Sequence, residues 1–134
     1  MPVEATETMA VSRSEDVVRV RQAVRTAAVA AGFSLVDQTK IITAASEIAR
    51  NTVDYGGGGT LTIEMLREGA RRGVALTFID HGPGIADVQR ALTDGFTSGN
   101  GLGLGLSGAR RLSTEFSIKS APGEGTIVKL ARWK

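Results

Sequence analysis

Cysteine is absent from this chain of 134 residues, and aromatic residues make up only 4% of it. The lack of cysteine excludes disulfide bonds and thiolate metal sites and suits a cytoplasmic location. One tryptophan, one tyrosine and four phenylalanines offer no stacking platform for single-stranded nucleic acid. The only histidine, His81, has no second histidine or cysteine with which to share a metal ion.

An excess of charge of one sign is also missing. The 16 basic and 14 acidic residues leave a net charge of +2, which creates no field strong enough to capture DNA. No apolar run approaches the roughly 20 residues that cross a bilayer, and the N-terminus lacks the apolar region of a secretory signal. We therefore predict a protein that binds neither nucleic acid nor membrane.

The length fits one domain, which we expect to cover residues 12–134 after a flexible N-terminal arm over residues 1–11. Two long helices are predicted, over 12–32 and 34–56, and Ser12 and Glu15 have the spacing of a capping box. Apolar or small residues recur every three or four positions along both helices. These inner positions are Val17, Val20, Val24, Ala27, Ala31, Ile41, Ala45, Ile48 and Thr52.

Alternating side chains predict strands over 60–65, 74–80, 116–120 and 126–130, the last two forming a hairpin. The strand that ends at Asp80 is apolar on both faces, which places it inside the sheet. Short helices are expected over 86–92 and from Ser107. This order predicts an α+β fold, a two-layer α/β sandwich with helices on one face of a mixed, mostly antiparallel sheet.

Glycine is concentrated in the stretch from Asp94 to Leu112, where it alternates with leucine. Glycine permits close approach of a ligand to the backbone, and the leucines anchor the loop, so the stretch resembles a flap over a bound molecule. It leads into the predicted helix at Ser107, whose free amides favour an anion such as polyphosphate. No strand precedes the glycines and no Walker A lysine follows them, which excludes dinucleotide-binding and P-loop folds.

Asp80 closes a buried strand and is followed by a turn that contains Gly82 and Gly84. A carboxylate at that depth needs hydrogen-bond donors, and the exocyclic amine of a purine would supply one. The two glycines would then give the base flat access to the backbone. The alternative is an aspartate that only caps a tight turn. The side chain of His81 in the same turn is expected to point outward.

Glu47 and Asn51 lie four residues apart on the second predicted helix, so their side chains leave the same face one turn apart. That face borders the apolar stripe. Such a pair is either a solvent-exposed hydrogen bond or part of a site.

Four motifs in order resemble the N, G1, G2 and G3 boxes of the GHKL ATPases. They are Glu47-x-x-x-Asn51, Asp80-x-Gly82-x-Gly84, Gly101-x-Gly103-x-Gly105 and Gly123-x-Gly125-Thr126. Within that superfamily the short chain is similar to serine/threonine kinases of the RsbT type, which act in the bacterial stressosome. The RsbW and SpoIIAB anti-sigma factor kinases are the nearest alternative. The resemblance covers roughly residues 12–131 and implies the Bergerat fold.

The resemblance implies ATP and Mg²⁺ as ligands. Asn51 would hold Mg²⁺, Glu47 would act as the catalytic base, Asp80 would bind the adenine amine, and Thr126 would assist through water. The remaining implied nucleotide contacts are Gly82, Gly84, Ile85, Gly101, Leu102, Gly103, Leu104 and Gly105. Arg110 and Arg111 are further candidates to reach a phosphate or a partner.

The implied partners are STAS-domain proteins of the RsbS and RsbR type, as phosphorylation substrates, and a PP2C-type phosphatase that the kinase binds and activates. The phenylalanine-rich segment of sensor histidine kinases is missing, which argues against autophosphorylation on histidine. Two classes stay open. The chain is a kinase, or it is a module that uses nucleotide as a latch to seize a sigma factor or a phosphatase.

Overall fold

The structure is a computed structural model that describes residues 3–92 and 105–134. Its strands are β1 (Val3–Val11), β2 (Gly59–Glu68), β3 (Arg71–Asp80), β4 (Glu115–Ser120) and β5 (Thr126–Trp133). Its helices are α1 (Ser14–Ala30), α2 (Leu35–Asp54), α3 (Val88–Ala91) and α4 (Leu106–Arg111). No helix in the described residues is both long enough and apolar enough to cross a membrane.

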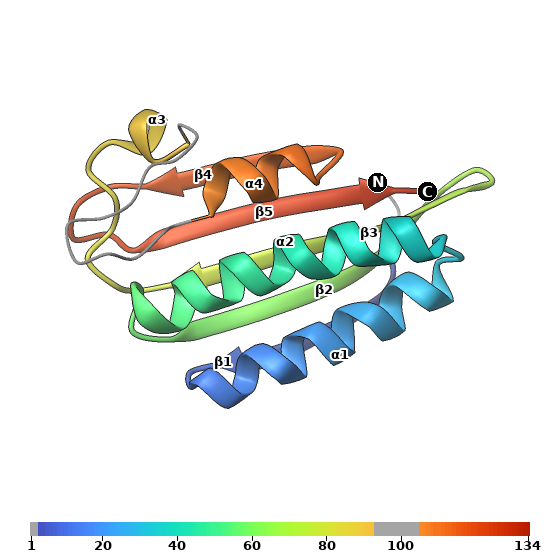
Figure 1. The fold of residues 1–134 in the computed structure, drawn as a ribbon, viewed down its shortest axis with the longest axis horizontal. Coiled ribbons are helices and arrows are strands. Elements are labelled where there is room, and N and C mark those ends of the chain that lie inside the picture. The colour runs from blue at the N-terminus through green and yellow to red at the C-terminus, as the bar shows by residue number, and fades with distance from the viewer. Residues whose placement is uncertain (1–2, 93–104) are drawn as a thin grey trace.

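The strands form one sheet in the order β1-β2-β3-β5-β4, and α1, α2 and α4 lie on one face of it (Figure 1). This arrangement confirms the α+β two-layer sandwich. Every strand pairing within the described residues is antiparallel, so the expected mixed sheet is wrong in that detail. β3 occupies the central position that its two apolar faces predicted.

The expectation of a flexible arm over residues 1–11 is wrong for residues 3–11, which form β1 and pair antiparallel with β2. Only Val11 is fully buried, while Glu4, Thr6 and most other side chains of the strand are exposed. Edge strands often carry charged and polar residues because an exposed apolar edge invites aggregation. The acidic and polar residues of this segment therefore belong to an edge strand.

Both long helices begin one or two residues after the predicted starts. Ser34 caps α2 as expected, since its Oγ accepts a hydrogen bond from the backbone N of Asp37 at 3.2 Å. At α1 the partner is Asp16 instead of Glu15: its Oδ2 accepts from the backbone N of Ser12 at 2.9 Å and of Arg13 at 3.1 Å. These two donors hold the pKa of Asp16 below its usual value.

The core lies between the helices and the covered face of the sheet. Val20 and Val24 from α1, Ile41 from α2 and Leu76 from β3 are all fully buried. Val20 and Val24 are four residues apart, as the helical period predicts, and Val74, Leu76 and Phe78, all buried, show the two-residue period of a strand. This packing fixes α2 against β3 and so sets the position of every side chain on the inner face of α2.

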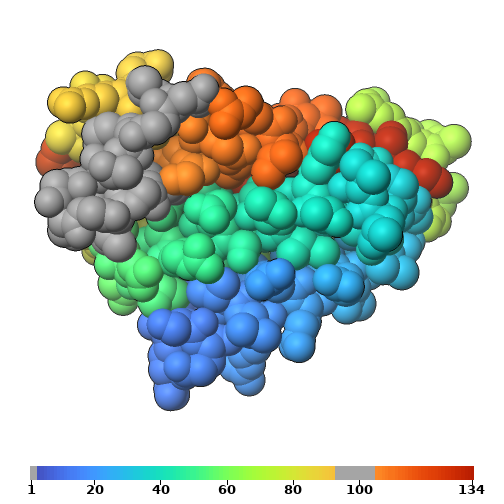
Figure 2. All heavy atoms as spheres, viewed as in Figure 1, coloured from blue at the N-terminus to red at the C-terminus, as the bar shows by residue number. Residues whose placement is uncertain are grey.

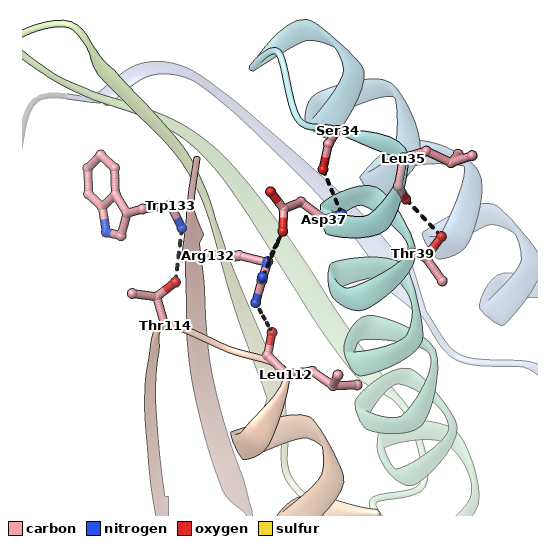
Figure 3. A network of polar contacts seen from close by, with 8 residues as sticks. All are labelled: Ser34, Leu35, Asp37, Thr39, Leu112, Thr114, Arg132 and Trp133. Atoms are coloured by element: carbon pink, nitrogen blue, oxygen red, sulfur yellow. Dashed lines mark hydrogen bonds and ion pairs between the residues drawn. The ribbon is translucent and has the colours of Figure 1, made fainter.

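The guanidinium group of Arg132 joins three elements at the N-terminal end of α2 (Figure 3). Arg132 of β5 donates from Nη2 to Asp37 Oδ1 at 2.7 Å and from Nη1 to the carbonyl oxygen of Leu112 at 2.8 Å. Leu112 is the C-terminal cap of α4. The bond from Arg132 lowers the pKa of Asp37. Arg132 therefore ties β5 to the start of α2 and to the end of α4.

We predict that Arg132→Met lowers the free energy of unfolding at pH 7 by about 1–3 kcal/mol, because hydrogen bonds to charged groups contribute about that much. Urea titration measures the change. Arg21→Met is the control, since Arg21 is exposed on α1, and it should change stability by less than about 0.5 kcal/mol.

The same contact should make stability depend on pH. Because the pKa of Asp37 is lower in the folded chain, its contribution is complete above the ordinary pKa of 3.8 and is lost as the pH falls through the lower folded value. The difference between wild type and Arg132→Met should therefore narrow in acid. An equal difference at neutral and acid pH would contradict the ion-pair assignment.

Candidate functional site

Three of the four predicted motifs meet at one end of the sheet. Asp80 is the last residue of β3 and lies directly opposite Thr126, the first residue of β5, in the antiparallel ladder. The C-terminal half of α2 packs against β3 and contributes Asn51. A cavity between them is lined by Ile48, Asn51, Thr52, Tyr55, Phe78, Asp80, Ile85, Leu106, Thr126 and Val128. Four of the predicted nucleotide contacts, Asn51, Asp80, Ile85 and Thr126, thus line one space.

The carboxylate of Asp80 is only 8% exposed and is shielded by glycines. Its Oδ1 accepts a hydrogen bond from the backbone N of Gly82 at 2.9 Å. A Cβ atom on Gly56 would lie 2.5 Å from Asp80 Oδ2, and one on Gly82 would lie 2.7 Å from the carbonyl oxygen of Gly56. Two stretches of bare backbone are therefore layered over the carboxylate, and no larger residue fits there without displacing it.

The turn after β3 is fixed from both sides. Tyr55, which follows α2, donates from its hydroxyl to the carbonyl oxygen of Gly84 at 3.1 Å. Gly84 has a φ of +77°, and a Cβ there would collide with the carbonyl oxygen of Ala121. Across the turn, Gly123 donates from its backbone N to the carbonyl oxygen of Pro83 at 2.7 Å. Gly82 and Gly84 thus serve the shape of this turn, while His81 is exposed as expected.

Glu47 lies one helical turn before Asn51, and its side chain is 39% exposed. Its Oε1 pairs with Arg50 Nη1 at 3.7 Å. A Cβ on Gly105 would collide with the Glu47 carboxylate, so the backbone at the start of α4 passes directly against it. Gly105 has a φ of +63° and caps α4. Glu47 is therefore an accessible carboxylate at the junction between α2 and the end of the glycine stretch.

Gly101, Leu102, Gly103 and Leu104 lie outside the described residues. Arg110 and Arg111 both lie on the exposed side of α4. Figure 2 shows α4 beside α2 in the helical layer, with α1 on the other side of α2.

The cavity is small, at about 20 Å³, which is room for one water molecule. Leu106, the first residue of α4 and 2% exposed, forms part of the cavity wall. A purine base would need Leu106 to move. A larger hollow of about 410 Å³ lies on the uncovered face of the sheet, but none of the predicted site residues line it. Chemistry thus favours the small cavity, which combines apolar walls with oxygen-bearing side chains that include Asp80 and Thr126.

The residues present fit an adenine nucleotide in their chemistry. Asp80 Oδ2 accepts no hydrogen bond from the described residues and is available to an exocyclic amine. In the described part of the chain no three histidine, cysteine or acidic residues gather into a metal-binding group. Asn51 alone is typical of a Mg²⁺ site in which phosphates and water supply most ligands.

Residues 36–134 match the family described as the histidine kinase-, DNA gyrase B- and HSP90-like ATPases. The chain belongs to that family of ATPases. It is 43% identical over 118 residues to the serine/threonine-protein kinase RsbT of Bacillus subtilis, covering 88% of this chain and 89% of that protein. The chain is therefore of the RsbT type of serine/threonine kinase. It is also 29% identical to an anti-sigma F factor of Thermoanaerobacter, over 69% of this chain and 68% of that one.

Solved structures agree on the fold. The RsbU and RsbW domains of a Mycobacterium tuberculosis protein superpose with a TM-score of 0.62 at 19% identity, over 94% of this chain and 32% of that one. Our chain thus spans about a third of that protein. The SiaB–SiaC complex of Pseudomonas aeruginosa superposes with a TM-score of 0.54 at 14% identity, over 98% of this chain and 91% of that one.

Three residues in or beside the site were not identified from the sequence: Gly56, Tyr55 and Ser120, whose Oγ is bonded to Ile85 and Thr126. Gly56 stood in a run of four glycines that predicted only a turn, and Tyr55 in a helix end. Ser120 is the last residue of β4 and faces Thr126 across the hairpin, so the hairpin register was the signal that could have found it.

We predict that Gly56→Ala weakens ATP binding about tenfold, because overpacking against Asp80 costs about 1–3 kcal/mol. Isothermal titration calorimetry measures the affinity. Gly108→Ala is the matched control: Gly108 lies in α4 and a Cβ there meets nothing within 4 Å. Equal affinities for the two variants would show that Gly56 has no part in shielding the carboxylate.

Proposed function

We propose that this chain is an ATP-dependent kinase that phosphorylates serine or threonine on STAS-domain proteins of the RsbS and RsbR type, and that it then binds and activates a PP2C-type phosphatase. The observation that carries the proposal is Glu47, an accessible carboxylate one turn from Asn51 and in contact with Gly105. The 43% identity to RsbT supports the same reading. We further propose that residues 12–134, together with β1, act as a single ATP-binding kinase domain.

The described residues have separate roles in the proposed reaction. Asp80 and Thr126 hold the purine, and Ile85 packs beside it. Asn51 holds Mg²⁺ through its side-chain oxygen. Bound ATP supplies the phosphoryl group. Because phosphoryl transfer depends mainly on positioning and on neutralisation of charge, the rigid contacts around Asp80 contribute to rate as well as to affinity.

Glu47 acts as the base. The hydroxyl of the acceptor serine or threonine would lose its proton to the Glu47 carboxylate as its oxygen bonds to the γ-phosphorus of ATP, while the bond from that phosphorus to the bridging oxygen breaks and ADP leaves. The exposure of Glu47 suits this role, because a protein substrate must reach it from outside. Arg50, whose Nη1 lies 3.7 Å from Glu47 Oε1, helps to orient this carboxylate.

A second candidate is a nucleotide-gated anti-sigma factor that sequesters a sigma factor and phosphorylates an anti-anti-sigma factor. The 29% identity to an anti-sigma F factor favours it. Exposed apolar side chains on the helices, Val18 and Val29 of α1 and Leu35 and Val36 of α2, offer material for such an interface. Both candidates need the same ATP site, so they differ in partner rather than in chemistry.

We predict that Glu47→Gln keeps its affinity for ATP but loses phosphorylation of the STAS partner by about 100-fold or more, the usual contribution of a general base. The assay incubates the protein with Mg-ATP and STAS proteins encoded beside it and locates the phosphate by mass spectrometry. Glu68→Gln, in the exposed end of β2, is the matched control. Full activity in Glu47→Gln would remove Glu47 as the base.

We predict that Asp80→Asn abolishes ATP binding, because the amide presents a donor to the adenine amine or loses the bond from Gly82. Calorimetry with ATP measures this directly. Circular dichroism confirms that the variant is folded. Unaltered binding would refute the adenine assignment and leave the kinase proposal without its base-binding residue.

A further inference from the structure

Ser120 makes three hydrogen bonds beside the purine cavity, and their directions are fixed by chemistry. The backbone N of Ile85 donates to Ser120 Oγ at 2.8 Å. Ser120 Oγ lies 2.9 Å from the carbonyl oxygen of Gly125, which can only accept. The one hydroxyl hydrogen of Ser120 is therefore used on Gly125.

The third bond joins Ser120 Oγ to Thr126 Oγ1 at 2.8 Å. Since Ser120 has no second hydrogen, Thr126 must be the donor. The hydroxyl hydrogen of Thr126 then points toward Ser120 and away from the cavity. What Thr126 offers to the cavity is a pair of lone pairs, so it can only accept.

Asp80, like Thr126, presents a hydrogen-bond acceptor to the cavity. It is the direct partner of Thr126 across the β3–β5 ladder, and directly opposed side chains have Cβ atoms about 4.5–5.5 Å apart. Its Oδ1 is engaged by Gly82, and its Oδ2 accepts no bond from the described residues. Of the described residues, Asp80 and Thr126 therefore present two acceptors, and neither presents a donor, to one edge of a base at this end of the cavity.

We propose that Ser120, through Thr126, makes the site selective for a purine with an amino group at C6 over one with an oxo group. Ser120 is a positioning residue: it does not line the cavity, and it acts by directing the Thr126 hydroxyl. The amine at C6 of adenine has two hydrogens, one for each of the two acceptors, whereas a 6-oxopurine has an acceptor at C6 and only the hydrogen on N1 as a donor on that edge. At least one of Asp80 and Thr126 then faces the oxo oxygen without a hydrogen between them, and unpaired buried polar groups are a strong source of rejection in binding sites. The proposal rests on the proposed function, because it assumes that ATP binds here.

The test compares ATP with ITP, which carries an oxo group at C6. Calorimetry gives both affinities for wild type and for Ser120→Ala. In this variant Thr126 is free to rotate and donate to the oxo group. The preference for ATP over ITP should fall about tenfold, the worth of one hydrogen bond. Ser120→Thr keeps the hydroxyl and should keep the preference, and Ser117→Ala, an exposed position on the same strand, should leave it unchanged.

A purely structural role of Ser120 predicts a different effect on the two affinities. Ser120→Ala also removes the partners of Ile85 N and Gly125 O, which weakens both nucleotides alike and leaves their ratio unchanged. That result would overturn the proposal. If Ser120→Ala does not fold, Ser120→Cys keeps the shape with weak hydrogen bonding and should show the same fall in ratio.

The double variant Ser120→Ala with Thr126→Val isolates the route. Without the Thr126 hydroxyl, the Ser120 substitution should no longer change the ratio of the two affinities. If the ATP-to-ITP preference is lower in the double variant than in Thr126→Val alone, Ser120 acts by another path. That result would overturn the assignment. If the wild-type protein binds neither nucleotide, the proposed function itself fails. If it binds ATP but the ratios do not move, only the role of Ser120 fails.

Discussion

A carboxylate held at the end of a central strand is the constraint on which the nucleotide end of this molecule depends. Burying Asp80 costs free energy unless donors reach it, and the protein supplies one from Gly82 and leaves Oδ2 for a ligand. The surrounding backbone comes so close that only glycine fits at Gly56 and Gly82. Gly125 belongs to the same arrangement, because a Cβ there would meet the carbonyl oxygen of Asp80.

Much of the fold follows from periodicity. The three-to-four-residue stripe of α2 and the two apolar faces of β3 placed the core and the central strand, because burial alone decides such patterns. Strand β1 was not predicted, because an edge strand buries few side chains and its sequence is therefore mostly polar. The fully antiparallel pairing of the described strands was also not predicted. It depends on which strands become neighbours and not on local residues.

The sequence predicted those residues of the candidate site that belong to short motifs. Glu47, Asn51, Asp80 and Thr126 stand at fixed spacings, and the fold brings Asn51, Asp80 and Thr126 around one cavity. Ser120 was not predictable in this way. Its role arises from a hairpin register and from hydrogen-bond directions, which exist only when β4 and β5 are paired.

The two ends of α4 differ in how they are held. Leu112 at one end is bonded to Arg132, while Leu106 at the other end lines a cavity of about 20 Å³. The purine of the proposed function is far larger than this space, so its binding there would require the wall that includes Leu106 to move.

The strand order has a consequence for biosynthesis. β5 follows β4 along the chain but lies between β3 and β4 in the sheet. Until the ribosome has released residues 126–133, β3 presents an unpaired edge and β4 has no neighbour to join. β5 has to enter between β3 and β4, so Asp80 gains Thr126 as its ladder partner only once the C-terminal strand has joined the sheet.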